Sequence, residues 1–229
     1  RTYQPKHHWN IDEKKAMNTF FCLTEFIQTK PVDFFSNFNN IISKKESDYQ
    51  PKWLAIRNRR RVKHAEYLSQ IEHSDLKVYE QIIESIPENC QVQSSNSAVI
   101  RYVQMFSVKD SISIFCNRGT SGIDGSTSTA IGAAFASKKQ TVFITGDLSF
   151  FYDSNALWNK NIPANFRIIL VNNSGGGIFK IIPGPGTTNA ANYFETPHCL
   201  TAEHLCKMHE FDYQKAFSTA TIKKELKGF

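Results

Sequence analysis

Short apolar runs alternate with segments of helical pattern along most of this chain, from residue 52 to the end. Continuously apolar runs such as 141–145 and 166–171 are typical of parallel strands that are buried on both faces. We predict strands at 90–95, 111–116, 141–145 and 166–171, and a shorter strand near 213–217. We predict helices at 52–73, at 75–86 with Asp75 as N-cap, after Asn96, at 126–136, near 153–160, and from Thr201 and Ser218. This alternation predicts an α/β fold in which helices flank a doubly wound parallel sheet.

The first 50 residues have a different pattern. Residues 18–27 are predicted to form a strand, and Pro31 to open a helix that runs to residue 42. The polar stretch 43–51 ends in a proline and is predicted to be a linker. One strand and one helix cannot close a core alone. We therefore expect 1–50 to be the tail of a preceding domain plus its linker, and 51–229 to be a second domain that is truncated at its C-terminus.

Composition excludes several classes of protein. The chain has 229 residues, of which 41% are hydrophobic, so it can bury a substantial core. No apolar run reaches the roughly 18 residues of a membrane span, and the N-terminus has no apolar signal segment. The five cysteines lack CxxC spacing, which favours reduced thiols in a cytoplasmic protein.

The net charge of +6 is concentrated in the basic run 57–64. Such a run could bind nucleic acid through phosphate contacts. No nucleic-acid-binding motif accompanies it, so we interpret it as the solvated face of a helix.

Polar residues follow two of the predicted strands where each strand ends. Gly146-Asp147-Leu148-Ser149 comes after the strand at 141–145, and Asn172-Asn173-Ser174-Gly175-Gly176-Gly177 comes after the strand at 166–171. Parallel strands deliver the loops at their carboxyl ends to one edge of a sheet, where ligands bind. Carboxylate and amide oxygens suit Mg²⁺, which is usually held by one or two protein oxygens together with substrate phosphates. The two loops therefore predict a site for magnesium and a diphosphate, although Asp147 or Ser149 alone could equally be a helix N-cap.

A third loop, Asn117–Gly125, is rich in glycine and precedes a predicted helix. Its backbone can approach a ligand closely, and a helix N-terminus favours anions. It matches neither a P-loop nor a GxGxxG motif, and alone it could be an ordinary strand-to-helix turn. Histidines and cysteines near residues 199–209 lack the spacing of a zinc site, and His198 is interpreted as a loop or helix-entry residue.

The Asp147–Asn173 pattern resembles the thiamine-diphosphate signature, in which Gly-Asp-Gly is followed by paired asparagines, with Leu148 in place of the last glycine. Between about residues 90 and 200 the chain resembles one family in more detail: the 2-succinyl-5-enolpyruvyl-6-hydroxy-3-cyclohexene-1-carboxylate synthases of menaquinone biosynthesis. The strings that carry the resemblance are Asn96-Ser97-x-x-x-Arg101, Cys116–Gly125, Gly146–Ser149, Tyr152-Asp153-x-Asn155-Ala156-Leu157, Gly175-Gly176-x-Ile178-Phe179 and Phe194-Glu-Thr-Pro-His198.

The resemblance implies a homo-oligomeric synthase (a dimer or tetramer) that decarboxylates 2-oxoglutarate on thiamine diphosphate and adds the succinyl-semialdehyde carbanion to isochorismate. Residues 51–229 would be its pyrophosphate domain. Asp147, Asn173 and the Gly175 carbonyl would ligate Mg²⁺, and Ser149 with nearby loop amides would hold the diphosphate. Ile123 would support the bent cofactor from below. Further cofactor contacts would come from Gly119, Gly122, Gly146, Leu148, Gly176, Ile178 and Phe179.

The same resemblance implies that Ser97, Arg101 and Arg118 contact substrate carboxylates. Ser97 and Arg101 are four residues apart, so they share one face of a helix. Arginine is suited to bidentate recognition of carboxylates, although either arginine could instead form a structural salt bridge.

Relatives activate the cofactor with a glutamate from a separate pyrimidine domain, and no glutamate here matches it. We therefore expect this chain to be inactive alone. Two alternatives stay open: a related thiamine-dependent 2-oxo acid decarboxylase, and a non-catalytic phosphate- or nucleotide-binding module.

Overall fold

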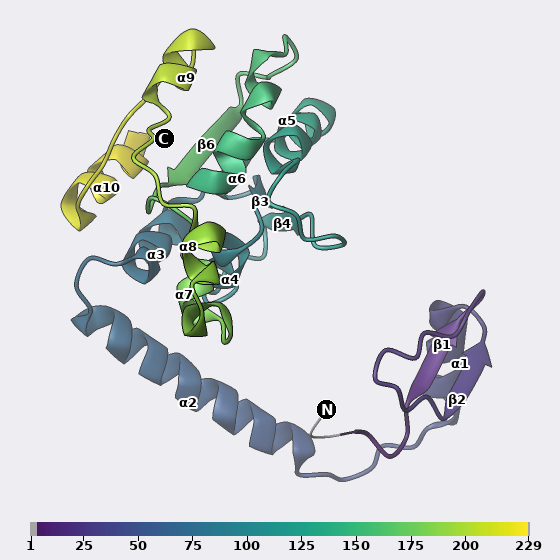
Figure 1. The fold of residues 1–229 in the computed structure, drawn as a ribbon. Coiled ribbons are helices and arrows are strands. Elements are labelled where there is room, and N and C mark those ends of the chain that lie inside the picture. Colours follow the sequence, from purple (N-terminus) through teal and green to yellow (C-terminus); the bar gives the residue numbers. More distant parts are fainter. Residues whose placement is uncertain (1–3, 229) are drawn as a thin grey trace. The chain divides into compact units, whose positions relative to one another are not determined.

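The structure is a computed structural model that describes residues 4–228 (Figure 1). The chain forms two compact units that divide between residues 63 and 64. This division lies inside a long helix, α2 (Tyr49–Gln70). The expected boundary between residues 50 and 51, and the assignment of each part to a named domain, stay predictions.

The first unit contains two short parallel strands, β1 (Trp9–Asp12) and β2 (Glu25–Gln28), and one helix, α1 (Pro31–Ile41). Pro31 opens α1 as predicted, because a proline at the first helical position loses no hydrogen bond. The predicted strand at 18–27 is wrong before residue 25. The Asn18 side chain accepts a hydrogen bond from the Leu23 amide (3.0 Å), and Phe21 has a left-handed φ of 55°, so a turn forms there instead.

The predicted linker at 43–51 is also wrong in its last part, because α2 begins at Tyr49. Pro51 lies in the first helical turn, where the backbone N–H groups have no partner within the helix, so the proline is tolerated. Residues 57–63 of the basic run are exposed on α2. Within residues 4–228, no helix is both long enough and apolar enough to cross a membrane.

The second unit is built on a four-stranded parallel sheet with the order β4-β3-β5-β6. Its strands are β3 (Gln91–Ser94), β4 (Ser113–Cys116), β5 (Thr141–Gly146) and β6 (Phe166–Val171). All four were predicted, and β3 and β4 are shorter than expected. The parallel pairing places the carboxyl ends of all four strands at one edge of the sheet.

Helices cover both faces of this sheet (Figure 1). One face packs against α3 (Asp75–Ser85) and α4 (Ala98–Val103). The other face packs against α5 (Ser126–Ser137), α6 (Asp147–Tyr152), the 3-10 helix η1 (Ser154–Trp158) and α9 (Glu203–Met208). Side chains alternate along β5 accordingly: Val142 and Ile144 join the first core, and Phe143 joins the second. The predicted doubly wound α/β fold is confirmed.

The connections between strands lead to opposite sides from the centre of the sheet. From β3 the chain passes through α4 to β4 on one side, whereas from β5 it passes through α6 and η1 to β6 on the other side. The neighbouring strands β3 and β5 therefore form a topological switch point, and the loops that follow them diverge. Ligands of open α/β sheets bind in the crevice at such a point.

Several predicted elements need correction. The N-cap of α3 is Ser74, whose hydroxyl accepts from the Lys77 amide, and Asp75 is the first helical residue. The helix predicted near 153–160 begins earlier, at Asp147, and continues as η1. Residues 213–217 pair with no strand, because Tyr213 instead packs against the core on the α5 side. The helix from Ser218 is confirmed as α10 (Thr219–Glu225), with a capping box at its start.

The remaining short elements lie between β6 and α9 and after α10. They are α7 (Ile178–Ile181), the 3-10 helix η2 (Pro185–Thr187), α8 (Ala190–Glu195) and the 3-10 helix η3 (Leu226–Gly228).

Candidate functional site

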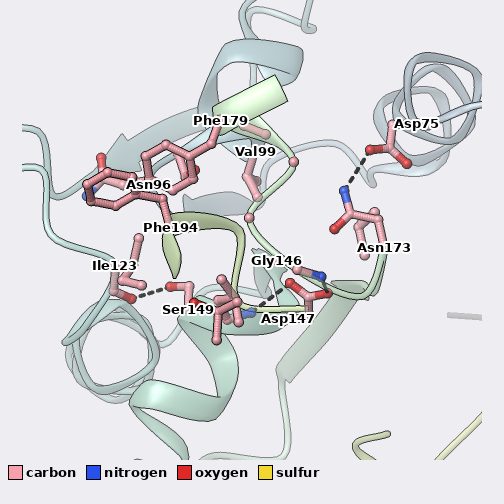
Figure 2. A pocket seen from close by; sticks show the side chains of 18 of the residues that line it. Asp75, Asn96, Val99, Ile123, Gly146, Asp147, Ser149, Asn173, Phe179 and Phe194 are labelled. Atoms are coloured by element: carbon pink, nitrogen blue, oxygen red, sulfur yellow. Dashed lines mark hydrogen bonds between the residues drawn. The ribbon is translucent and has the colours of Figure 1, made fainter. Parts of the chain in front are cut away.

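A cavity of about 360 Å³ opens at the switch point of the sheet (Figure 2). It lies within the size range of small-molecule sites. The loops after β3, β5 and β6 contribute to its wall, as do Ile123 and α8. Of the residues predicted for the site, the lining includes Ser97, Ile123, Gly146, Asp147, Leu148, Ser149, Asn173, Gly175, Gly176 and Phe179.

Asp147 is the buried carboxylate of this cavity, with 2% of its surface exposed. One carboxylate oxygen, Oδ1, accepts a hydrogen bond from the Leu148 amide (2.7 Å). The other, Oδ2, accepts from the Gly175 amide (3.0 Å). The two predicted loops therefore meet at Asp147, and the carboxylate keeps free lone pairs for a cation.

The glycine loop after β6 is shaped by close backbone contacts. Gly175 has φ +147°, and a Cβ at this position would lie 2.6 Å from the Glu195 carbonyl oxygen. The Gly176 amide donates to that same carbonyl oxygen at 2.6 Å. Glycine is therefore required at residue 175 by both conformation and space. These contacts attach the segment 194–198 to the loop.

Asn173 shares the cavity with Asp147, and its amide Nδ2 donates to the Asp75 carboxylate at 2.9 Å (Figure 2). Asp75 belongs to α3 and was predicted only as a helix cap. Tyr79 and Tyr102, which stack with ring centroids 4.8 Å apart, line the same side of the cavity. Burial, and secondarily the Asp75 charge, raises the pKa of Tyr79 well above its usual value, so its phenol stays neutral.

Ile123 and Ser149 are joined across the cavity wall. The Ser149 hydroxyl donates to the Ile123 carbonyl oxygen at 2.5 Å. This bond fixes the end of the glycine-rich loop against the first turn of α6. The predicted contact between Ser149 and a phosphate stays a prediction, since the hydroxyl proton is directed to Ile123.

Asn96 organises the opposite side of the site. Its amide Nδ2 donates to the carbonyl oxygens of Asn117 (2.8 Å) and Gly122 (2.7 Å), and its Oδ1 accepts from Arg118 Nη1 (3.1 Å). Asn96 was quoted in the sequence pattern without a role. Asn96 Oδ1 also accepts from Cys116 Sγ at 3.3 Å. Its burial, at 1% exposure, and these four hydrogen bonds explain why an asparagine suits this position.

The backbone at Ser97 is strained, with φ 69° and ψ −132°. Such a conformation in a residue other than glycine is rare and clusters at functional sites. Arg101 Nη1 donates to the Ser97 backbone carbonyl oxygen at 2.6 Å. Ser97 is the N-cap of α4 and not a helical residue, so the two residues are in contact but do not share a helix face as predicted.

Five predicted site residues do not line the cavity: Arg101, Arg118, Gly119, Gly122 and Ile178. Arg101 and Arg118 are exposed side chains, and their hydrogen bonds lead to Ser97 and Asn96 at the cavity margin. Ile178 is buried behind the wall at 6% exposure. Their proposed contacts with ligands stay predictions.

Two aromatic rings and one histidine add to the site. Phe179 and Phe194 stack at 5.2 Å and line the cavity together. The His198 Nε2 atom lies 3.3 Å from Asp147 Oδ2, although the angles are not those of a hydrogen bond. His198 Nδ1 accepts from the Leu200 amide at 3.1 Å, so the proton of the neutral ring sits on Nε2 and faces the carboxylate. His198 lies in a loop, as predicted, and its position beside Asp147 was not predicted.

The donor atoms of this cavity suit magnesium better than a transition metal. They are a buried carboxylate, a side-chain amide and backbone carbonyls, which are hard oxygen ligands. Within residues 4–228, no three His, Cys, Asp or Glu side chains gather as a metal cluster. A cation with few protein ligands, completed by phosphate oxygens, matches this set.

The chain was compared with protein-family models, curated proteins and solved structures. No protein-family model matches the chain. A 2-succinyl-5-enolpyruvyl-6-hydroxy-3-cyclohexene-1-carboxylate synthase of Flavobacterium psychrophilum is 54% identical over 228 residues, which are 99% of this chain and 42% of the relative. The proteins of the same name from Flavobacterium johnsoniae and Phocaeicola vulgatus are 53% and 36% identical, and the chain covers 41% and 40% of them.

A solved structure shares the fold. The thiamine diphosphate-dependent 4-hydroxybenzoylformate decarboxylase of Rhodococcus jostii superposes with a TM-score of 0.55 and 18% identity, over 69% of this chain and 30% of that one. The chain spans about two fifths of the length of the curated relatives that it matches. By its sequence, the chain belongs over this stretch to the family of 2-succinyl-5-enolpyruvyl-6-hydroxy-3-cyclohexene-1-carboxylate synthases.

Proposed function

We propose that this chain forms the magnesium- and diphosphate-binding part of a thiamine-diphosphate-dependent synthase. The observation that carries the proposal is the meeting of two loops at the buried carboxylate of Asp147, in a cavity that also contains Asn173. In this proposal Asp147, Asn173 and the Gly175 carbonyl hold Mg²⁺. The relatives are named as synthases of 2-succinyl-5-enolpyruvyl-6-hydroxy-3-cyclohexene-1-carboxylate, which supports a synthase function. The reaction proposed here is decarboxylation of 2-oxoglutarate and transfer of the succinyl-semialdehyde unit to isochorismate.

Bound thiamine diphosphate supplies the electron sink for decarboxylation, and the chain's own residues bind and orient. Ile123, which lines the cavity and is joined to Ser149, is suited to support the cofactor from below. The stacked rings of Phe179 and Phe194 form an apolar wall, which we propose keeps water from the bound cofactor. Such exclusion strengthens the electrostatic interactions inside a site.

Ser97, Arg101 and Arg118 are proposed to meet the substrate carboxylates. Both guanidinium groups are held at the margin of the cavity by the neighbouring residues 96 and 97. Both proposed substrates carry more than one carboxylate. A simple 2-oxo acid decarboxylase has no second carboxylate-rich substrate to bind and does not need both arginines. Arg118→Ala should therefore impair the reaction with isochorismate more than decarboxylation of 2-oxoglutarate.

The proposal is tested with the full-length protein in which these residues occur. Isochorismate consumption is measured with 2-oxoglutarate, thiamine diphosphate and magnesium, in wild type and in Asp147→Ala. We expect product from the wild type and at least a 100-fold loss in the variant, on the order of 3 kcal/mol of transition-state stabilisation. Decarboxylation without isochorismate consumption would favour a simple decarboxylase. Binding of nucleotides but not of thiamine diphosphate would favour a non-catalytic module.

Residues 1–229 alone are expected to show no turnover. No glutamate of this chain is assigned to activate the cofactor, and the family's active site is proposed to form between subunits of a homo-oligomer. The same assay applied to the isolated chain checks this expectation, and turnover there would contradict the proposed division of the site.

A further inference from the structure

Asn173 is joined to a residue that lies outside both predicted loops. Its Nδ2 donates to Asp75 Oδ2 at 2.9 Å, although the two residues are 98 positions apart in the sequence. Asp75 comes from the first turn of α3, and Asn173 follows β6. Both line the same cavity, and Figure 2 shows the amide nitrogen of Asn173 facing the Asp75 carboxylate.

This bond determines which end of the amide faces away from α3. A side-chain amide has a donor nitrogen and an acceptor oxygen, whereas an ionised carboxylate only accepts. Asp75 therefore selects the nitrogen, and Oδ1 of Asn173 is left on the other side of the amide. A cation binds the oxygen and is repelled by the NH₂ group, so the orientation matters for metal binding.

We propose that Asp75 is a positioning residue that presents the Asn173 amide oxygen to the divalent cation of this site. The inference rests on the proposed function, because it assigns a role to Asp75 at the same magnesium site. Partners that orient metal ligands from outside the coordination shell typically change metal affinity by about 10–100-fold when they are replaced. The competing explanation is purely structural: an acidic residue in the first turn stabilises α3 through the helix dipole.

The test measures magnesium affinity and not activity. In the full-length protein, magnesium is titrated at a fixed concentration of thiamine diphosphate, and cofactor binding is followed by quenching of tryptophan fluorescence or by calorimetry. Asp75→Asn can bond the amide in either orientation, so we expect its apparent magnesium affinity to fall by about 10–100-fold.

Ser74→Ala is the matched control. It removes the hydroxyl that caps α3, which accepts from the Lys77 amide, and leaves the Asp75–Asn173 bond intact. It should lower the melting temperature by weakening the helix start and leave magnesium affinity within about twofold of wild type. Equal losses of magnesium affinity in Ser74→Ala and Asp75→Asn would support the structural explanation and overturn the inference.

A reciprocal exchange separates orientation from charge. In Asp75→Asn/Asn173→Asp the donor and acceptor trade places, so a carboxylate oxygen faces the cation and the total charge is unchanged. We expect the magnesium affinity of the exchange variant to return to within about threefold of wild type. In Asn173→Asp alone, the carboxylates of residues 75 and 173 lie together and repel each other. No hydrogen bond then orients residue 173 toward the cation, so we expect this single variant to bind magnesium poorly. This coupling is read as a double-mutant cycle.

The titrations are repeated at low and high salt, because a long-range effect of the Asp75 charge is screened whereas amide orientation is not. Loss of the Asp75→Asn effect at high salt, or wild-type magnesium affinity in that variant at any salt, would overturn the inference. If Asp75→Asn alone does not fold, the exchange variant decides, because it restores a complementary hydrogen-bonded pair at residues 75 and 173: magnesium affinity far below wild type in the folded exchange variant would overturn the inference. Absence of magnesium-dependent cofactor binding in the wild type would instead contradict the proposed function.

Discussion

Asp147 and Gly175 form the closest link between the two loops of the site. The carboxylate bonds the Gly175 amide at 3.0 Å, and the conformation of that glycine lets the Glu195 carbonyl approach. A side chain at this position would meet the carbonyl before any ligand is bound. The absence of a Cβ at residue 175 therefore allows the loop after β6 to approach Asp147.

Gly175→Ala should destabilise the protein and weaken magnesium-dependent cofactor binding. The positive φ costs about 1–3 kcal/mol for a residue with a side chain, and the contact at 2.6 Å forces a shift of residues 194–198. Thermal unfolding and cofactor titration measure the two effects. Gly186→Ala is the control, since nothing lies within 4 Å of its added Cβ, and it should stay within about 0.5 kcal/mol of wild type. Equal behaviour of the two variants would contradict the assigned role of Gly175.

We expect His198 to stabilise the segment 196–200 beside Asp147. Its ring packs edge-on against Phe151, accepts from the Leu200 amide and faces the Asp147 carboxylate. His198→Ala removes these contacts, so hydrogen exchange of the Leu200 amide is expected to rise by at least tenfold, about 1.4 kcal/mol. His204→Ala, at an exposed position of α9, should leave that rate unchanged. A protected Leu200 amide in His198→Ala would refute the assignment.

The helices and strands around the site show what sequence pattern can and cannot predict. Strands β5 and β6 were predicted because continuous apolar runs are needed to bury both faces of a parallel strand. Their carboxyl ends then placed Asp147 and Asn173 at one edge. Asp75 and His198 were missed as site residues, because each reaches the loops from an element far away in the sequence and no local pattern reports such a contact.

The errors in element assignment have local causes. The strand expected at 18–27 was apolar enough, but the Asn18 side chain bonds a nearby backbone amide and competes with strand pairing. Residues 213–217 had strand-like composition, yet a strand needs a neighbour to pair with. Composition alone does not supply that information.

The packing of α3 on α4 should make the protein sensitive to alkaline pH through Tyr79. Burial raises the pKa of this phenol above its ordinary value near 10, so the folded state favours the neutral form. Its contribution is complete below pH 10 and is lost as pH rises toward the folded-state pKa, by about 1.4 kcal/mol per pH unit. Tyr79→Phe should remove this loss.

Denaturant unfolding of the full-length protein between pH 9 and 11 measures the effect. Tyr67→Phe is the control, because Tyr67 is 57% exposed and its hydroxyl is not buried by folding. A Tyr79→Phe variant that loses stability with the same slope as wild type would show that the phenol is not shielded in solution.

At the scale of the whole molecule, the chain carries one α/β sheet unit and a smaller unit, and the division between them lies inside α2. The sheet unit contains every residue proposed to hold magnesium. The relatives are more than twice as long as the stretch they share with this chain, so the proposed activity belongs to the longer protein. The resemblance seen between residues 90 and 200 extends to nearly the whole chain in the relatives.

The central claim is that the cavity at the switch point holds a divalent cation and a diphosphate. The most direct measurement is a crystal structure of the full-length protein with thiamine diphosphate and Mn²⁺ in place of Mg²⁺, using the anomalous signal of manganese. The account predicts one anomalous peak in contact with the Asp147 carboxylate, the Asn173 amide oxygen and the Gly175 carbonyl, with the diphosphate beside it. A bound cofactor whose manganese peak lies away from Asp147 and Asn173 would contradict the account.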